Sequence, residues 1–288
     1  LERLKIFNDQ RLAEPTNDIA VYSYIGPGRL LERTIFSGVK LTYLDNAGAQ
    51  VGYDALPRII QHRHEKSDDT TIGDFTYAHN RENMRLAEHR LHQPVSGTDT
   101  KGESYLYDSR YRLKDFKVGT QDTAVNIALP DTQTQYGLDG VGNRESTDID
   151  GNLTSYAANN MNEYTSVGTT SLVYDEMGNM KDDGVFTFTH DALNRLIGVV
   201  RKSDGKTATY TYDVLNRRLA KSGTLVNTIR FYHDGAREIE ERDGADLVQA
   251  QYVFGNGIDE VLTKEAGGQT YYYHDNSLGS ITALTDAN

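Results

Sequence analysis

Aromatic and polar residues alternate in short runs along most of the chain, and many of these runs end in aspartate. In Phe186-Thr187-Phe188 and Tyr210-Thr211-Tyr212 two rings are separated by one polar residue, so both rings lie on the same face of an extended strand. Aspartate follows, then a stretch rich in Gly and Asn, then Arg or an aliphatic residue. An Asp side chain can bond the backbone two residues on, and Gly or Asn tolerates the positive φ of a tight turn. The pattern therefore predicts β-hairpins.

The hairpin unit recurs about every 20 residues, which is the mark of a repeat architecture. The aspartates of successive units are 16, 22, 21 and 41 residues apart, at Asp175, Asp191, Asp213, Asp234 and Asp275. The last gap leaves room for a degenerate copy at residues 252–257. Weaker copies precede the clear ones, at residues 22–24, 41–48, 75–77 and 136–144. Further turn dipeptides such as Asp150-Gly151 fall between units. Because a single hairpin is marginally stable in water, the units are expected to stack side by side.

The repeats cover almost the whole chain, so we predict an all-β fold of tandem β-hairpins in a single repeat region over residues 1–288. The copies are degenerate over about residues 1–100 and clearer over about residues 101–288. One segment, Arg81 to His92, is also compatible with a helix, because it contains good helix formers and no Gly or Pro. We favour a strand there, in register with the flanking repeats.

The motif Tyr-Asp-x-x-Gly followed by Asn or Arg resembles the YD repeat of the RHS-repeat family. That family includes bacterial RHS proteins, the C components of insecticidal toxin complexes and the animal teneurins. The resemblance is strongest from Tyr174 onward, and residues 271–286 are similar to the RHS core signature, in which a Tyr/His/Asp stretch runs into Leu-Gly-Ser. The residues that match the repeat motif are Tyr107, Asp108, Tyr174, Asp175, Gly178, Asn179, Asp191, Asn194, Arg195, Tyr212, Asp213, Asn216, Arg217, Tyr273, Asp275 and Gly279.

The resemblance implies a curved antiparallel sheet that spirals as part of a hollow shell. It implies a non-catalytic, structural role in encapsulating or presenting a C-terminal effector or toxin domain, in a secreted or cell-surface setting. The implied partners are the remaining repeats and the C-terminal domain of the same polypeptide. Toxin-bearing members carry an Asp-Pro self-cleavage motif, but no proline of this chain follows an aspartate, and the chain starts without Met. We therefore interpret it as a fragment of a larger protein.

Composition narrows the remaining possibilities. The chain has 19 Tyr and 26 Gly but only 5 Pro, which favours strands with turns over helices or a disordered linker. The formal net charge of -12 argues against a nucleic-acid partner, which requires clustered Lys and Arg. Cysteine is absent, so disulfides and thiol nucleophiles are excluded. No apolar run reaches the roughly 20 residues that a membrane-spanning helix needs.

Candidate catalytic and cofactor motifs fail on spacing. A Walker-type loop ending at Gly205-Lys206-Thr207 would need glycine where Val200 stands. We interpret the turns at residues 139–143 and 148–152 as repeat turns, because neither has the glutamate that completes a calcium loop. The histidines are interpreted as solvated strand residues and not as metal ligands, at His62, His64, His89 and His92.

The many aspartates recur with the repeat, as turn residues do and a unique active site does not. We therefore predict no enzyme activity, no cofactor and no metal. An adhesion or carbohydrate-binding module on the same scaffold remains the alternative, since outward-facing rings could stack on sugars or on cell-surface proteins.

Overall fold

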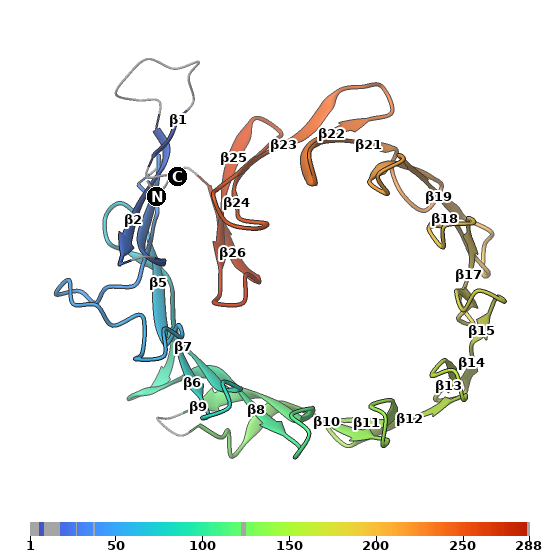
Figure 1. Ribbon diagram of the computed structural model, residues 1–288, viewed down its shortest axis with the longest axis horizontal. Coiled ribbons are helices and arrows are strands. Elements are labelled where there is room, and N and C mark those ends of the chain that lie inside the picture. Colours follow the sequence, from blue (N-terminus) through green and yellow to red (C-terminus); the bar gives the residue numbers. More distant parts are fainter. Residues whose placement is uncertain (1–5, 9–17, 27, 37, 122–124, 287–288) are drawn as a thin grey trace. The chain divides into compact units, whose positions relative to one another are not determined.

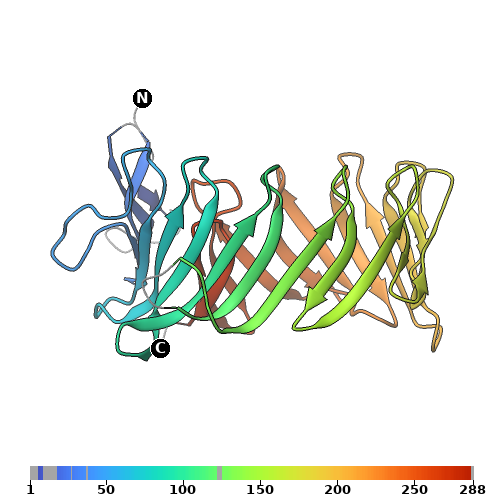
Figure 2. The same cartoon turned by 90° about the horizontal axis from the view of Figure 1, so that it is seen from below.

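The computed structural model describes residues 6–8, 18–26, 28–36, 38–121 and 125–286, and its regular structure is entirely β (Figures 1 and 2). In this described part the chain forms two sheets and no helix. Within each sheet, strands that are consecutive in the chain are hydrogen-bonded to one another in antiparallel hairpins. The predicted all-β fold of tandem antiparallel hairpins is confirmed.

The first sheet contains 14 strands in chain order: β1 (Ile6–Asn8), β2 (Asp18–Ile25), β3 (Arg29–Ile35), β4 (Lys40–Thr42), β5 (Gln61–Glu65), β6 (Thr71–His79), β7 (Arg85–Ser96), β8 (Asp99–Tyr107), β9 (Leu113–Gln121), β10 (Pro130–Leu138), β11 (Arg144–Ile149), β12 (Asn152–Ala158), β13 (Tyr164–Val167) and β14 (Thr170–Ser171). The second contains 12: β15 (Val173–Tyr174), β16 (Met180–Asp182), β17 (Phe186–His190), β18 (Leu196–Arg201), β19 (Thr207–Tyr212), β20 (Arg218–Gly223), β21 (Ile229–Asp234), β22 (Arg237–Asp243), β23 (Val248–Phe254), β24 (Val261–Ala266), β25 (Gln269–Asp275) and β26 (Ile281–Thr285).

The chain divides into two compact units. The first unit comprises residues 1–134, 253–264 and 268–288, and the second comprises residues 135–252 and 265–267. Both units contain the same kind of hairpin. That the repeats form a single region over residues 1–288 stays a prediction.

A five-residue turn follows most of the aromatic pairs. In the copy that starts at Asp175, the Asp175 N–H donates to the carbonyl of Asn179 (2.9 Å) and the Gly178 N–H donates to the carbonyl of Asp175 (3.1 Å). This is a three-residue hairpin loop closed by a residue in the left-handed region. Gly178 has φ 81°, and Asn194 and Asn216 hold the same place in the next copies with φ 60° and 64°. The register of the ladder shifts by one residue beside each turn.

The segment that was also compatible with a helix forms a turn and a strand. Asn80 Oδ1 accepts the Met84 N–H at 2.8 Å, and Asn83 takes the positive φ of 66°. Strand β7 then begins at Arg85 and pairs with β6 and β8. The preference for a strand is confirmed, because pairing with a strand on each edge outweighs the helix propensity of these residues.

Buried apolar side chains are concentrated in the first unit. On β6 the buried positions alternate, and Phe75 and Tyr77 lie on the covered face. Ala20 and Tyr22 of β2 pack with Leu262 of β24, which joins a late strand to an early one within this unit. The second unit has fewer buried apolar side chains among its described residues: Val199, Ala208, Phe231 and Ala250.

The turn geometry predicts that two glycine substitutions within the second unit lower the free energy of unfolding by different amounts. Gly178→Ala forces a side chain into the left-handed region at φ 81°, so we expect a loss of about 1 kcal/mol in the free energy of unfolding, measured by urea denaturation. Gly140→Ala is the control, because Gly140 lies in the Asp139 turn without a positive φ and a Cβ there meets no atom within 4 Å. Equal effects of the two changes would contradict this account of the turn.

Candidate functional site

Four turns are closed by an aspartate and an arginine four residues apart, an arrangement that we call a turn clip. In the Asp191 copy, Oδ1 accepts the backbone N–H groups of Leu193 (2.9 Å) and Arg195 (3.0 Å). Oδ2 accepts the Arg195 Nε–H at 2.7 Å. The same contacts recur at Asp54–Arg58, Asp108–Arg112 and Asp213–Arg217. One carboxylate thus satisfies the turn backbone and holds the arginine.

The clip favours the ionised form of its aspartate. The backbone and side-chain hydrogen bonds from Arg112 and the backbone N–H of Arg110 lower the pKa of Asp108 to about 2. The hydrogen bond from the Arg195 side chain lowers the pKa of Asp191 in the same way. A lowered pKa in the folded state means that the clip stabilises the fold above the ordinary aspartate pKa and weakens as the pH falls through the folded value.

In several clips the residue that ends the turn also reaches the next turn along the sheet. Arg195 Nη1 donates to the carbonyl of Asp213 (3.0 Å), and Arg217 Nη1 donates to the carbonyl of Gly235 (2.6 Å). Where asparagine ends the turn, Asn179 Nδ2 donates to Asn194 Oδ1 (3.0 Å). Equivalent bonds join Arg58 to Asn80 and Asn143 to Asn162. Successive turns are therefore cross-linked along one end of the strands.

The tyrosine that precedes the aspartate ties its strand to the previous hairpin. The Tyr212 hydroxyl donates to the carbonyl of Leu196 at 2.8 Å, and the Arg195 guanidinium lies over its ring, 5.1 Å from the centroid. Tyr107 and Tyr174 hold the same position and are half-buried. His190 replaces tyrosine in the Asp191 copy. The motif residues thus work within and between neighbouring hairpins.

The last copy has a different register from the one expected. Asn276 and not Asp275 begins the clip, since Asn276 Oδ1 accepts the N–H groups of Leu278 (3.0 Å) and Ser280 (3.2 Å). Gly279 keeps the positive φ, at 76°. Asp275 therefore stands where the other copies have tyrosine, and Tyr273 lies beside buried Tyr272 and His274 on β25.

Three clips of the same type were missed in the sequence. They begin at Asp54, Asn80 and Asn159, and Asp54 even forms the full pair with Arg58 Nε (2.6 Å). The signal was present but relaxed, because Asn replaces Asp at Asn80 and Asn159 and because none of the three turns contains glycine.

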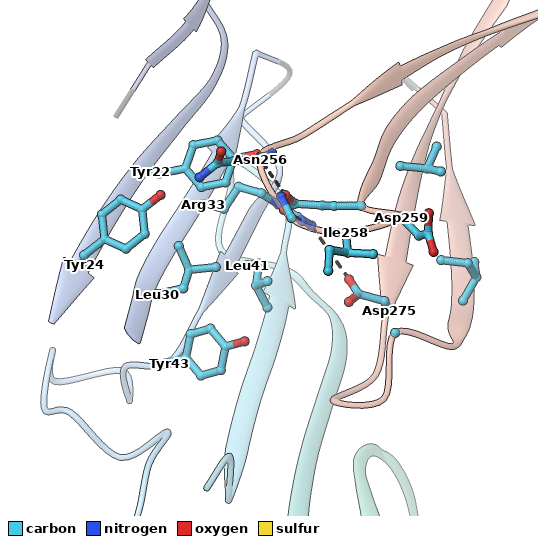
Figure 3. Close-up of a pocket in the computed structure, with 15 residues that line it drawn as sticks. Tyr22, Tyr24, Leu30, Arg33, Leu41, Tyr43, Asn256, Ile258, Asp259 and Asp275 are labelled. Atoms are coloured by element: carbon cyan, nitrogen blue, oxygen red, sulfur yellow. Dashed lines mark hydrogen bonds and ion pairs between the residues drawn. The ribbon is translucent and has the colours of Figure 1, made fainter. Parts of the chain in front are cut away.

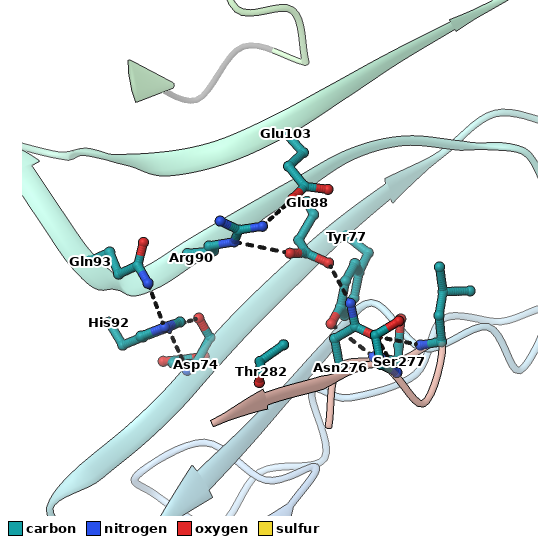
Figure 4. Close-up of polar contacts among 12 residues, drawn as sticks. Asp74, Tyr77, Glu88, Arg90, His92, Gln93, Glu103, Asn276, Ser277 and Thr282 are labelled. Atoms are coloured by element: carbon teal, nitrogen blue, oxygen red, sulfur yellow. Dashed lines mark hydrogen bonds and ion pairs between the residues drawn. The ribbon is translucent and has the colours of Figure 1, made fainter. Parts of the chain in front are cut away.

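A second polar cluster lies in the first unit, where the loop after β23 and the β25–β26 hairpin meet β2–β7 (Figures 3 and 4). Arg33 is 3% exposed and pairs with Glu260, and its Nη2 lies 3.8 Å from Asp275 Oδ1. The Tyr22 hydroxyl donates to Glu260 Oε2 at 3.3 Å. Burial, and then the charge of Glu260, raises the pKa of Tyr22 to about 12. These groups border a pocket of about 340 Å³, which Tyr24, Leu30, Leu41 and Ile258 also line.

The histidines His62 and His64 were expected to be solvated, and that expectation is wrong. They are 2% and 1% exposed on β5, because the hairpin β25–β26 covers them and its Asp275 carbonyl accepts from both Nε2 atoms, at 3.1 and 2.8 Å. His89 and His92 on β7 are half-buried, and His92 contacts the backbone of Asp74. No sequence motif signals this interface.

Carboxylates and arginines continue the cluster along β7 and β8 (Figure 4). Glu88 is 1% exposed and pairs with Arg85 and Arg90, and Arg90 also pairs with Glu103. Burial, and then the charge of Glu103, raises the pKa of Glu88. Asn276 Nδ2 of the hairpin donates to Glu88 Oε2 at 3.4 Å.

No metal-binding arrangement is present in the part of the chain that the structure describes, in the sense of three or more His, Asp or Glu side chains gathered as ligands. Nor is any helix in the described residues long and apolar enough to cross a membrane.

Comparison with known proteins places the fold. The chain is similar to chains of the Photorhabdus luminescens Tc holotoxin pore (17% identity, 93% of this chain and 15% of that chain, TM-score 0.69) and of the TcdB2-TccC3-TEV crystal structure (17%, 93% and 15%, TM-score 0.65). The likeness shows that these hairpins adopt an RHS-like fold, as found in the Tc structures that contain TccC3.

Sequence relatives are named as nucleases. The chain is 34% identical over 163 residues to the tRNA3(Ser)-specific nuclease WapA of Bacillus spizizenii, and 35% identical over 162 residues to the tRNA nuclease WapA of Bacillus subtilis strain 168. Each match covers 54% of this chain and 7% of the relative. No family model matches the chain.

The clip geometry predicts a graded response to changes at Asp191. Asp191→Asn keeps an oxygen for the backbone N–H groups but loses the charged bond to Arg195, whereas Asp191→Ala loses both. We expect the urea concentration at the midpoint of unfolding of the second unit to be highest for the wild type, lower for Asp191→Asn and lowest for Asp191→Ala. Glu176→Ala, an exposed carboxylate within a neighbouring turn, is the control and should leave the midpoint unchanged. An Ala variant as stable as the wild type would refute a role for the clip.

Proposed function

We propose that the chain is a non-catalytic wall segment of a larger RHS/YD-repeat protein, in which its hairpins enclose or present a C-terminal effector domain. The observation that carries the proposal is the repetition of one hairpin with one turn clip through both units. The recurring aspartates and arginines, which could suggest an active site, are used by the turns of the repeat itself. The segment's partners would then be the neighbouring repeats and the downstream domain of the same polypeptide.

The comparisons support the wall role at the level of fold. The Tc structures provide the fold likeness, and the WapA proteins provide a sequence likeness to a small part of much longer chains. The likeness to the Tc holotoxin structure is consistent with a secreted or cell-surface setting, which we propose for this protein.

We propose that the segment itself does not cleave tRNA, although its sequence relatives are named as tRNA nucleases. The chain carries a formal net charge of -12, and the clip arginines Arg112, Arg195 and Arg217 are bonded to aspartates. Phosphate binding needs clustered and available cations.

Glycan binding on the same scaffold has less support. In the second unit, guanidinium groups cover rings that a sugar would stack on: Arg195 lies over Tyr212, and Arg218 lies over Phe231 at 4.7 Å from the centroid. Phe231 is also 5% exposed.

Enclosure of a downstream domain can be tested by limited proteolysis of the longest native form of the protein. We expect the downstream domain to be cut about tenfold faster when Asp191→Ala and Asp213→Ala are combined, because loosened hairpins open the wall more often. The Glu176→Ala variant should behave as the wild type. Equal cleavage of the downstream domain in all three proteins, with the paired variant shown to be destabilised, would contradict enclosure.

The absence of nuclease activity has its own test. The purified 288-residue chain, incubated with total tRNA and divalent cations, should leave the tRNA intact on a denaturing gel, while an added ribonuclease cleaves it. Cleavage that copurifies with the chain and changes with its point variants would overturn the non-catalytic assignment.

A further inference from the structure

The hairpin formed by β25, β26 and the turn between them, residues 269–285, packs on β5–β7 within the first unit (Figure 4). We call it the C-terminal hairpin. The Ser277 N–H donates to the Tyr77 hydroxyl at 3.1 Å, and Arg85 donates to the Ser277 hydroxyl. With the Asn276–Glu88 bond, these contacts hold the turn of the hairpin. They are polar contacts, so the docking depends on the charge state of the groups that face it.

Two histidines of β5 bond the backbone of this hairpin. His62 Nε2 and His64 Nε2 lie 3.1 and 2.8 Å from the carbonyl oxygen of Asp275. A carbonyl oxygen only accepts, so each Nε2 carries the proton, and in the neutral ring Nδ1 is bare. The Nδ1 atom of His62 is buried without a hydrogen-bond partner in the described structure. A second proton on this ring would therefore be a buried charge with no acceptor.

A third histidine comes from the hairpin itself. His274 on β25 is 1% exposed, its Nε2 lies 2.9 Å from Thr285 Oγ1, and its Nδ1 is also buried without a partner in the described part. The ring of His64 lies between the other two, 5.0 Å from that of His274 and 5.5 Å from that of His62, centroid to centroid. Protonation would place three positive charges next to one another, two on β5 and one on β25 of the hairpin.

The charged groups that face the histidines do not compensate these charges. Arg33 of β3 and Arg85 of β7 are cations, and their charges disfavour protonation of His62. Asp275 Oδ1 lies 3.9 Å from His64 Nε2 but also 3.8 Å from Arg33. The rings of Tyr43, Phe75 and Tyr77 also contact His62. Two further carboxylates are nearby, but arginines already neutralise them: Glu260 pairs with Arg33, and Glu88 pairs with Arg85 and Arg90.

Burial dominates the titration of all three rings. It lowers the pKa of His62 and of His274 from 6.5 to about 4, and it lowers the pKa of His64 well below the ordinary value. A histidine whose pKa is lower in the docked state than in the free state favours docking at high pH. That contribution is lost as the pH falls from about 6.5 toward about 4.

We propose that the C-terminal hairpin is an acid-sensitive latch, which stays docked while His62, His64 and His274 are neutral and is released when they are protonated. For a histidine whose pKa is 6.5 when the hairpin is free and about 4 when it is docked, the docking constant at pH 5 is about 30-fold lower than at high pH, and this holds for His62 and for His274. His62 and His274 together then give about a 1000-fold change. The latch does not depend on the proposed wall function.

Energy transfer between two labels on the 288-residue chain can follow the latch directly. The chain has no native cysteine, and Leu56 and Leu278 are 65% and 72% exposed on the borders of one pocket. With dyes on Leu56→Cys and Leu278→Cys, we expect high transfer at pH 8 and a reversible loss between about pH 6.5 and 4. Over the same pH range, the backbone amides of residues 186–222 in the second unit should still exchange slowly, which would show that this unit stays folded. Undiminished transfer at pH 4, or a loss that coincides with unfolding of residues 186–222, would overturn the latch.

Glutamine variants separate the histidines from other acid effects. The triple variant His62→Gln, His64→Gln, His274→Gln keeps an N–H donor at each place but does not titrate, so we expect docking at pH 8 and little response to acid. His190→Gln, in the second unit, should respond as the wild type does. An unchanged acid response of the triple variant would refute the proposal.

If the triple variant fails to dock at pH 8, proton NMR titration of the wild-type rings decides. If the pKa values of His62 and His274 in the docked hairpin are near 6.5, the latch is overturned, and if both pKa values are well below 6.5, the latch is supported.

Discussion

The turn clip is the interaction on which both sheets depend, because an isolated hairpin is only marginally stable. One aspartate oxygen bonds two turn amides, the other holds an arginine, and the arginine bonds the next turn, as Asp191, Arg195 and Asp213 show. Local turn formation and the stacking of neighbouring hairpins are thus coupled through one pair of side chains. Since the turn fixes the register of its two strands, the same pair also decides which face each tyrosine occupies.

The second unit relies most on this coupling. Few of its described apolar side chains are buried, among them Val199, Ala208 and Phe231, so nearest-neighbour contacts must supply much of its stability. The first unit adds a different kind of contact, in which late segments of the chain cover early strands through buried histidines, arginines and carboxylates such as His64, Arg33 and Glu88. The attraction within buried ion pairs of this kind is offset by the cost of removing both charges from water, so they add little net stability.

Local features of the fold could be predicted from the sequence, because they are encoded by neighbouring residues. The alternation of rings, the aspartate and the glycine or asparagine of the turn lie within about ten residues, a range over which strand and turn chemistry can be inferred. The same reasoning placed the strand after Asn80, where helix propensity was the competing signal. It failed where the motif is relaxed: Asn276 replaces aspartate, and Asp275 was taken for the turn residue.

The buried interface could not be predicted, because its partners are far apart in the sequence. His62 and His64 meet Asp275 across more than 200 residues, and Arg33 meets Glu260 across 227. Each looks like an ordinary polar residue of an exposed strand, and only the docking of a distant hairpin buries it. Long-range pairing of this kind leaves no periodic signal in a single sequence.

The central claim, that this chain is a stretch of wall made of clipped hairpins, is tested most directly by a cryo-EM map of the longest native form of the protein. The account predicts that residues 1–288 form hairpins whose sheets continue into neighbouring repeats and border density for another segment. A compact domain with a filled core and a polar cleft, and with no strand pairing to the rest of the protein, would contradict it.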